Sequence, residues 1–181
     1  EFFERVLFRD RLSDASNINK AEDDPEADSK EKRDINIALA AEKLDGYILL
    51  SGESLSLLKL LDVNSSQSRY IVARENFTGL EAEYVGGGIS QVATALYNAA
   101  LTSNLKIDSR TSYTYAPDFG LLGFDAYVNA ATGADLVLTN TDPMPVRINA
   151  SYSGDRITVT VTGTIFRPSD FADLDLDEDV K

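Results

Sequence analysis

The sequence predicts an α+β fold, in which a mostly antiparallel β-sheet carries two or three packed helices. Two segments, residues 34–46 and 89–101, repeat apolar residues at the spacing of a helix with one buried face. The C-terminal half then holds four β-rich runs joined by short connections. Helices that precede a series of strands, instead of alternating with them, are typical of the α+β class.

The first helix is expected over residues 34–46. Its apolar stripe consists of Ile37, the Ala40–Ala41 pair and Leu44. Asp34 is a suitable N-cap, and Gly46 is suited to end the helix because glycine accepts the left-handed backbone found there.

Short strands and turns are expected around these helices. We expect a buried strand over Tyr47–Leu50, a short helix over Ser54–Leu61, a strand over Arg69–Ala73 and a loop over residues 109–123. The four β-rich runs of the C-terminal half are residues 124–131, 135–140, 145–152 and 156–166. The last run alternates apolar residues with threonines, and Gly154–Asp155 predicts a hairpin turn before it.

Both ends of the chain differ in composition from the middle, which gives three predicted divisions. Residues 1–32 form an N-terminal segment, in which residues 2–12 are expected to be a strand or short helix and the acidic run 13–32 a mobile loop. Residues 33–166 form the main domain, and residues 167–181 form an acidic tail. The tail lacks the glycine and closing glutamate of a calcium loop, so we expect it to be solvated.

The net charge of −13 excludes several classes of protein. Nucleic-acid binders present basic patches, and anionic membranes attract basic segments, so neither partner fits. The chain has no cysteine and no histidine, which excludes disulfides, Cys/His zinc sites and Ser–His–Asp triads. We expect no cofactor, no metal and no membrane insertion in this segment, and we expect any targeting segment to lie upstream of Glu1.

Three consecutive glycines, Gly86–Gly88, lead directly into the second predicted helix, which begins at Ile89. Glycine permits backbone conformations closed to other residues and a close approach by another chain. Ser90 and Gln91 fall in the first helical turn, where unpaired N–H groups and the helix dipole favour negative charge. A thiol at this point would be acidified towards a reactive thiolate, but the residue is a serine.

The residues of this motif resemble the VanW-like domain family of bacterial cell-envelope proteins. The resemblance covers roughly Asn36–Gly163, and its specific part is the glycine motif followed by the Leu-Tyr-Asn-Ala helix at residues 96–99. Supporting blocks are Asn36–Gly46, Gly52–Glu53, Gly123–Val128 and Asp135–Asn140, with Tyr70 and Gly79 at the spacing of the family. The resemblance implies an extracellular, cell-envelope location.

Some VanW-domain proteins act as L,D-transpeptidases, which form 3-3 peptidoglycan cross-links through a cysteine. The resemblance places that cysteine at Ser90 and the histidine of a His-Ser pair at Tyr113, so these are the candidate catalytic positions. Serine is a poor nucleophile without an adjacent general base. Ser90 is either an engineered Cys→Ser change or natural drift, and the simultaneous absence of histidine favours drift.

Four further positions are candidates for binding: Gly87, Gly88, Gln91 and Asp125. Each also has a structural interpretation. The glycines can form a tight turn that brings helix and sheet together, Gln91 can face solvent, and Asp125 can close a loop by hydrogen bonding.

Three functions are compatible with the sequence. The first is a catalytically degenerate domain, a pseudoenzyme that associates with peptidoglycan stem peptides. The second is an active acyl-transfer enzyme that uses Ser90 with a base other than histidine. The third is a structural spacer of a surface protein.

Overall fold

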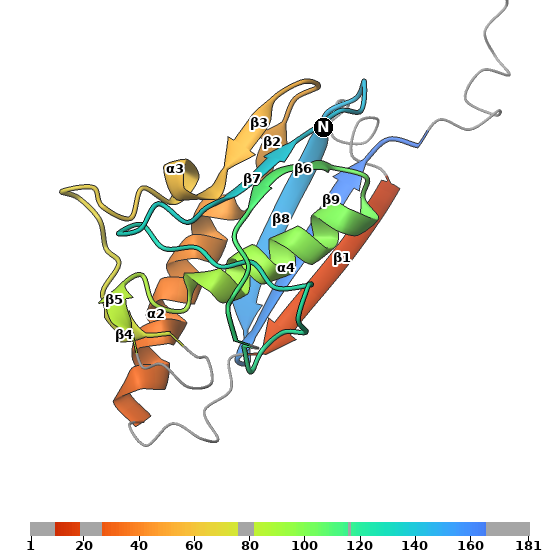
Figure 1. Ribbon diagram of the computed structural model, residues 1–181. Helices are drawn as coiled ribbons and strands as arrows, with labels where there is room; N and C mark the ends of the chain where they lie inside the picture. The colour runs from red at the N-terminus through yellow and green to blue at the C-terminus, as the bar shows by residue number, and fades with distance from the viewer. Residues whose placement is uncertain (1–9, 19–26, 76–81, 116, 166–181) are drawn as a thin grey trace, which may run out of the picture.

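The main layer of the molecule is a four-stranded antiparallel sheet. The computed structural model describes residues 10–18, 27–75, 82–115 and 117–165. The sheet contains β1 (Asp10–Ile18), β9 (Arg156–Gly163), β8 (Val146–Ser153) and β2 (Tyr47–Leu49), in the order β1-β9-β8-β2. Each neighbouring pair is antiparallel. The strand order places β1 at one edge of the sheet (Figure 1).

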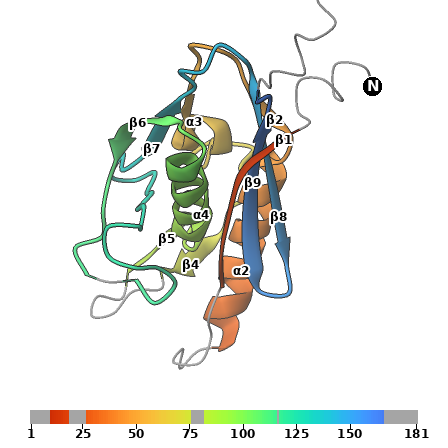
Figure 2. The ribbon, with the colours of Figure 1, turned by 90° about the vertical axis from the view of Figure 1, so that its right-hand side faces the viewer.

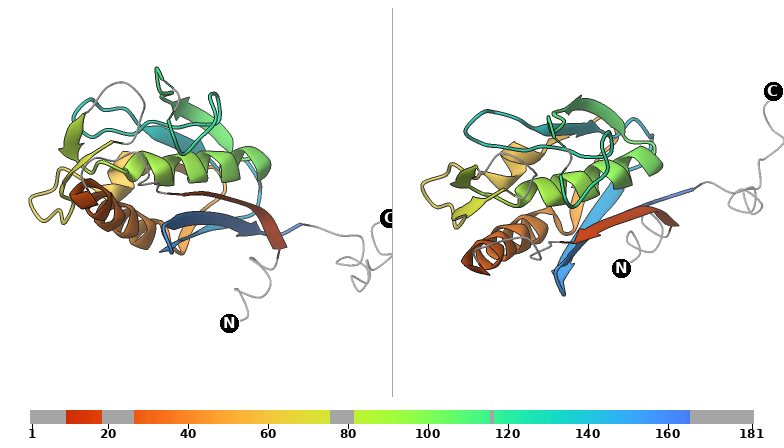
Figure 3. Two further views of the ribbon diagram at one scale, coloured as in Figure 1. Left: turned by 90° about the horizontal axis from the view of Figure 1, so that it is seen from below. Right: turned by 60° about the horizontal axis from the view of Figure 1, so that its bottom comes forward.

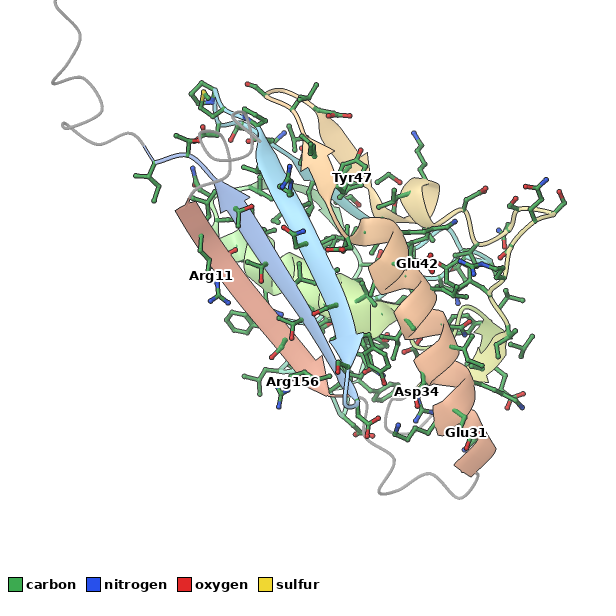
Figure 4. All side chains as sticks on the ribbon, turned by 180° about the vertical axis from the view of Figure 1, so that it is seen from behind. Arg11, Glu31, Asp34, Glu42, Tyr47 and Arg156 are labelled. Atoms are coloured by element: carbon green, nitrogen blue, oxygen red, sulfur yellow. The ribbon has the colours of Figure 1, made fainter. Side chains whose placement is uncertain are left out.

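Two helices pack on this sheet in different ways. Helix α2 (Ala27–Leu44) lies beside β8 and continues the layer beyond it, whereas α4 (Ile89–Thr102) crosses one face of the sheet (Figures 1 and 3). No described helix or strand covers the opposite face of the sheet, which carries side chains of β8, β9 and β1, including Arg11 and Arg156 (Figure 4).

Smaller sheets lie on the other side of α4. One contains β3 (Ser54–Ser56), β7 (Leu136–Thr139) and β6 (Lys106–Arg110) in the order β3-β7-β6, and the second pairs β4 (Val72–Arg74) with β5 (Glu83–Val85). The short helix α3 (Leu57–Leu61) follows β3. Helix α4 contacts β1 and β9 on one side and β6 and β7 on the other, so it lies between two layers of strands (Figure 2). The α+β class and the mostly antiparallel sheet are therefore confirmed.

The position of α4 between two layers corrects one expectation about that helix. The predicted apolar stripe is buried, but so are Ser90, Gln91 and Thr94 on the other sides of the helix. Periodicity identified one packed face of α4, whereas strands, helix α2 and segment 124–128 together cover most of the helix. The polar side chains that this brings into the interior must find partners there, because an unpaired buried polar group costs about 1–3 kcal/mol.

The expectation of a mobile loop over residues 13–32 is wrong wherever the structure describes that stretch. Strand β1 continues to Ile18, and α2 begins at Ala27, seven residues before the predicted cap at Asp34. An edge strand needs apolar side chains on one face only, and the main chain of β1 pairs with β9 along its length. The first turns of α2 are held by Lys30, which binds Asp34 at 2.9 Å and Asp155 at 2.8 Å. The predicted acidic tail and residues 2–9 lie outside the described residues.

Other elements match with local differences. The stretch 54–61 is strand β3 followed by α3, not one helix, and residues 124–131 form only isolated bridges. In the stretch predicted as a buried strand, Leu49 is buried but Ile48 and Leu50 are exposed. The hairpin at Gly154–Asp155 is confirmed, with φ of 55° and 65° at its two residues, and Gly46 follows the end of α2 with φ of 75°.

Candidate functional site

The glycine motif forms a tight turn that packs against two other elements. Gly86 and Gly88 have φ of 90° and 98°, values that L-residues with a side chain rarely adopt. A Cβ at Gly87 would lie 2.1 Å from the carbonyl oxygen of Ala73, and one at Gly88 would lie 3.0 Å from Cβ of Arg33. Both glycines therefore allow the close approach of helix and sheet that their structural interpretation requires, and their role in binding stays a prediction.

Asn36 of α2 holds this turn in place. Its side-chain amide donates to the carbonyl oxygens of Gly87 at 2.9 Å and Ile71 at 3.0 Å, and its Oδ1 accepts from the N–H of Ile71 at 3.0 Å. The side chain is completely buried. One amide thus joins α2, the start of the β4 region and the glycine turn, and it fixes where α4 begins.

Ser90 has no exposed surface, and its hydroxyl group contacts the backbone of Val128. The hydroxyl oxygen accepts from the N–H of Val128 at 3.2 Å and lies 3.3 Å from the carbonyl oxygen of the same residue. Both backbone groups of Val128 are thereby partnered in the interior. These hydrogen bonds give the Ser90 hydroxyl a structural role that does not require catalysis.

The contact of Ser90 is one rung of a regular ladder between α4 and the extended segment 124–128. The rungs pair Ser90 with Val128, Thr94 with Ala126 and Asn98 with Phe124. Four residues of an α-helix advance about 6 Å and two residues of an extended chain about 6.6 Å, so the two repeats stay in step. The ladder accounts for three polar residues on one side of a buried helix.

Glu75, which follows β4, is a site residue that the sequence did not lead us to expect. Its Oε2 lies 3.4 Å from Oγ of Ser90, and it accepts a short hydrogen bond from the hydroxyl of Tyr84. The side chain is 2% exposed. The sequence does contain a signal for the position of Glu75. Side chains alternate along a strand, so Glu75, two residues beyond the predicted end at Ala73, lies on the same face as Ala73.

Tyr113, where the resemblance predicts the family histidine, lies in the same cluster. The hydroxyls of Tyr113, Tyr84 and Ser90 and the backbone N–H of Gly88 all face the carboxyl group of Glu75. The ring of Tyr113 packs edge-to-face against Tyr127, with 5.0 Å between ring centroids. The structure therefore brings together the two predicted catalytic positions, and their catalytic role stays a prediction.

Burial shifts the protonation of this cluster. It raises the pKa of Glu75 above its usual range, although the surrounding hydroxyls and the Gly88 N–H act in the opposite direction. The pKa values of Tyr84 and Tyr113 are raised by burial and then by the neighbouring Glu75 charge. The low-dielectric interior disfavours the ionised forms of Glu75, Tyr84 and Tyr113, and this is why burial raises the pKa of each.

The remaining predicted residues lie close by. Gln91 is fully buried, which rules out the solvent-facing alternative. Asp125 is also buried, and its carboxylate accepts from the N–H groups of Tyr113 at 2.7 Å and Gly123 at 2.9 Å and from Arg110 at 3.2 Å. Asp125 thus closes the loop that carries Tyr113, while the binding roles of both residues stay predictions.

The chemistry open to this site is limited. A nucleophilic hydroxyl requires a base, and Glu75 is the acidic group within reach of Ser90 among the described residues. Two N–H groups at the start of α4 that could stabilise an oxyanion are already bonded, since Ile89 donates to Gly86 at 3.1 Å and Gln91 to Gly88 at 3.0 Å. The described residues contain no group of three or more acidic side chains placed to hold a metal ion.

A comparison with protein families matches the family of VanW-like proteins to residues 32–162, and these residues include the glycine turn, Glu75, Ser90, Tyr113 and Asp125. The chain belongs to the VanW-like protein family. The resemblance identified from the glycine motif is thereby confirmed.

This VanW-like chain is similar to the uncharacterized protein YoaR of Bacillus subtilis (strain 168), with 30% identity over 133 residues. The match covers 74% of this chain and 44% of YoaR, so the VanW-like chain spans less than half the length of that relative. No solved structure matches it. None of the helices in the described ranges combines the length and apolar character needed to cross a membrane.

Proposed function

We propose that this VanW-like domain is a peptidoglycan-associated module of the bacterial cell envelope that no longer carries out L,D-transpeptidation. The observation that supports this most directly is the state of Ser90. It occupies the position of the family cysteine, has no exposed surface and uses its hydroxyl to satisfy the backbone of Val128. The chain has neither a thiol nor an imidazole to supply the family chemistry.

Binding and turnover of muropeptides with tetrapeptide stems test the proposal. We expect the purified protein to bind these stems and to form no 3-3 dimers and no covalent adduct. Tyr113 faces Ser90, so the Ser90→Cys, Tyr113→His double variant restores the predicted pair of the family, and a gain of activity by this variant would show that a stem-binding groove is retained. Dimer formation by the unaltered chain that disappears in Ser90→Ala would contradict the proposal, and failure of both forms to bind stems would favour a spacer domain.

Glu75 supports a second candidate function, an acyl-transfer enzyme with a Ser–Glu pair. Its carboxylate oxygen lies 3.4 Å from Oγ of Ser90, close to the distance at which a base accepts a proton. In this mechanism Glu75 must be ionised to accept the Ser90 proton, and burial opposes that ionisation. The second function therefore requires turnover that rises with pH as Glu75 loses its proton.

The two functions predict different results for Glu75→Gln. In the Ser–Glu enzyme this variant abolishes adduct formation and its pH dependence together. In the degenerate domain no adduct forms in either protein, and stem binding persists. Glu83, an exposed acid on β5, provides a matched control, because Glu83→Gln makes the same substitution on the neighbouring strand outside the buried cluster.

A further inference from the structure

A small cavity lies between the last turns of α2 and the loop that joins α3 to β4. Its volume is about 180 Å³, and its lining includes Leu39 and Lys43 of α2 and Ser65, Ser68 and Tyr70 of the loop. The loop extends beside α2 (Figure 1). Pockets for drug-sized ligands occupy about 300–1,000 Å³, so this cavity has room for one small group.

Tyr70 carries a buried hydroxyl that the protein does not satisfy. The residue is 7% exposed, and its hydroxyl has no hydrogen-bond partner among the described residues. The ammonium group of Lys43 binds the carbonyl oxygen of Leu61 and lies 5.7 Å from the centroid of the Tyr70 ring. A buried polar group without a partner is unfavourable, so a molecule in the cavity that bonds to this hydroxyl gains affinity.

Two serine hydroxyls add hydrogen-bond donors to the cavity. Oγ of Ser65 accepts from the N–H of Gln67 at 3.2 Å, and Oγ of Ser68 accepts from the N–H of Tyr70 at 3.3 Å. Neither O–H has an acceptor in the part of the chain that the structure describes, so both remain available to donate. The loop therefore offers the cavity three hydroxyl groups, each with an unused O–H.

The charges around the cavity are balanced. Lys43 and Arg69 line it together with Asp62, and Arg69 also pairs at 3.1 Å with Glu42 of α2 (Figure 4). Burial raises the pKa of Tyr70, while the charges of Arg69 and Glu42 act on that pKa in opposite directions. A charged ligand therefore meets repulsion as well as attraction, whereas the N–H groups of the two cations can still donate to a neutral one.

We propose that this cavity binds a single neutral sugar residue. Each sugar hydroxyl has one O–H but two lone pairs, and the ring and glycosidic oxygens only accept, so a sugar offers more acceptors than donors. It therefore matches a donor-rich cavity without adding a charge, and Leu39 supplies an apolar surface for its C–H groups. The inference goes beyond the proposed function, because it concerns a sugar instead of a stem peptide and uses none of the residues around Ser90.

The probe is the methyl glycoside of N-acetylglucosamine, titrated into the full chain by calorimetry and amide NMR. We expect saturable binding with a Kd of roughly 1 mM, as suits a ligand this small, and the largest shifts in residues 62–70 and the last turns of α2. The methyl glycosides of glucosamine and of glucuronic acid carry a positive and a negative charge on the same ring. Both are expected to bind more weakly, because Lys43 and Asp62 both line the cavity.

Tyr70→Phe and Tyr47→Phe provide a matched pair of variants. The Tyr70 hydroxyl bonds to none of the described residues, so Tyr70→Phe should not lower the free energy of unfolding, which urea unfolding checks. It is expected to weaken binding of the glycoside about five- to tenfold through the loss of one hydrogen bond. Tyr47 lies on β2 and does not line the cavity, so Tyr47→Phe should change the affinity less than about twofold.

Three results would overturn the proposal. They are the absence of saturable binding, which would leave water as the occupant of the cavity, equal or tighter binding of either charged glycoside, and equal effects of the two tyrosine variants.

A trimer of N-acetylglucosamine distinguishes the sources of the sugar. Binding of both the trimer and the glycoside would support a unit of a glycan chain, and binding of the glycoside alone would support a free sugar. Stem peptides without any sugar, titrated separately, test the proposed function on its own, so failure of one inference leaves the other measurable.

Discussion

Oγ of Ser90 lies 3.4 Å from Oε2 of Glu75, although 15 positions of the sequence separate them. The glycine turn and the pairing of β4 with β5 bring the two residues together, since Glu75 is anchored to the end of this pair by a hydrogen bond of 2.9 Å from its N–H to the carbonyl of Ala82. Ser90, where the resemblance predicts the family cysteine, is therefore next to a buried carboxyl group. The charge next to the Ser90 hydroxyl therefore depends on whether Glu75 is protonated.

Replacing Glu75 is expected to change how stability depends on pH. Burial raises the pKa of Glu75 in the folded state above its ordinary value of 4.5. Its contribution is fully present below pH 4.5 and is lost as the pH rises through the folded-state pKa, because the unfolded chain ionises first. The slope is about 1.4 kcal/mol per pH unit within that window. Glu75→Gln removes the titration, so its free energy of unfolding relative to the unaltered chain should increase from pH 4.5 upward.

Urea unfolding of both proteins at a series of pH values measures this difference. Glu83→Gln controls for the loss of one negative charge from an already acidic chain. Parallel stability curves for the unaltered chain and Glu75→Gln would show that Glu75 has the same pKa folded and unfolded, contrary to its burial.

The ladder between α4 and segment 124–128 is expected to contribute to stability independently of any reaction. Thr94→Val keeps the shape of the side chain but leaves the N–H of Ala126 without the hydroxyl that accepts from it at 3.0 Å. The expected loss is about 1–3 kcal/mol in the free energy of unfolding. Thr102→Val, at the exposed end of the same helix, is the matched control. It should change the free energy of unfolding by no more than about 0.5 kcal/mol. Equal effects of the two substitutions in urea unfolding would argue against the ladder.

The glycine turn is expected to reject even one methyl group. A Cβ at Gly87 would lie 2.1 Å from the carbonyl oxygen of Ala73, a contact that requires the backbone to move. Gly87→Ala should therefore lower the free energy of unfolding by at least about 3 kcal/mol or prevent folding. At Gly120 the nearest atom is 3.5 Å away, an ordinary contact, so Gly120→Ala should be tolerated. Thermal unfolding by circular dichroism compares the pair, and a Gly87→Ala protein as stable as Gly120→Ala would contradict this packing.

Asp125 is expected to hold the loop that carries Tyr113. Its carboxylate accepts from two backbone N–H groups and from Arg110 and is 1% exposed. Asp125→Ala leaves these donors without an acceptor, and we expect a loss of at least about 2 kcal/mol, since hydrogen bonds to charged groups are among the stronger ones. Hydrogen exchange at the Tyr113 amide should accelerate in this variant.

Asp118 lies exposed on the same loop, which makes Asp118→Ala the control for the charge change. It should alter neither stability nor exchange at Tyr113. Unchanged exchange at this amide in Asp125→Ala would mean that other contacts hold the loop.

The sequence by itself determined the family and the central helix, and it showed that the chain contains neither cysteine nor histidine. Helix α4 was predictable because its apolar residues recur with the period of a helix, and the Gly154–Asp155 hairpin because glycine and aspartate favour such turns. The absence of cysteine and histidine is a property of composition that no fold can change.

Only the tertiary structure decided the surroundings of Ser90. Periodicity describes one element at a time, so it shows neither that strands cover α4 on two sides nor that Glu75 meets Ser90 in the interior. The strand at residues 13–18 was missed for a related reason. Its residues are polar and form β1 because β9 supplies hydrogen-bonding partners, an interaction between segments at opposite ends of the chain.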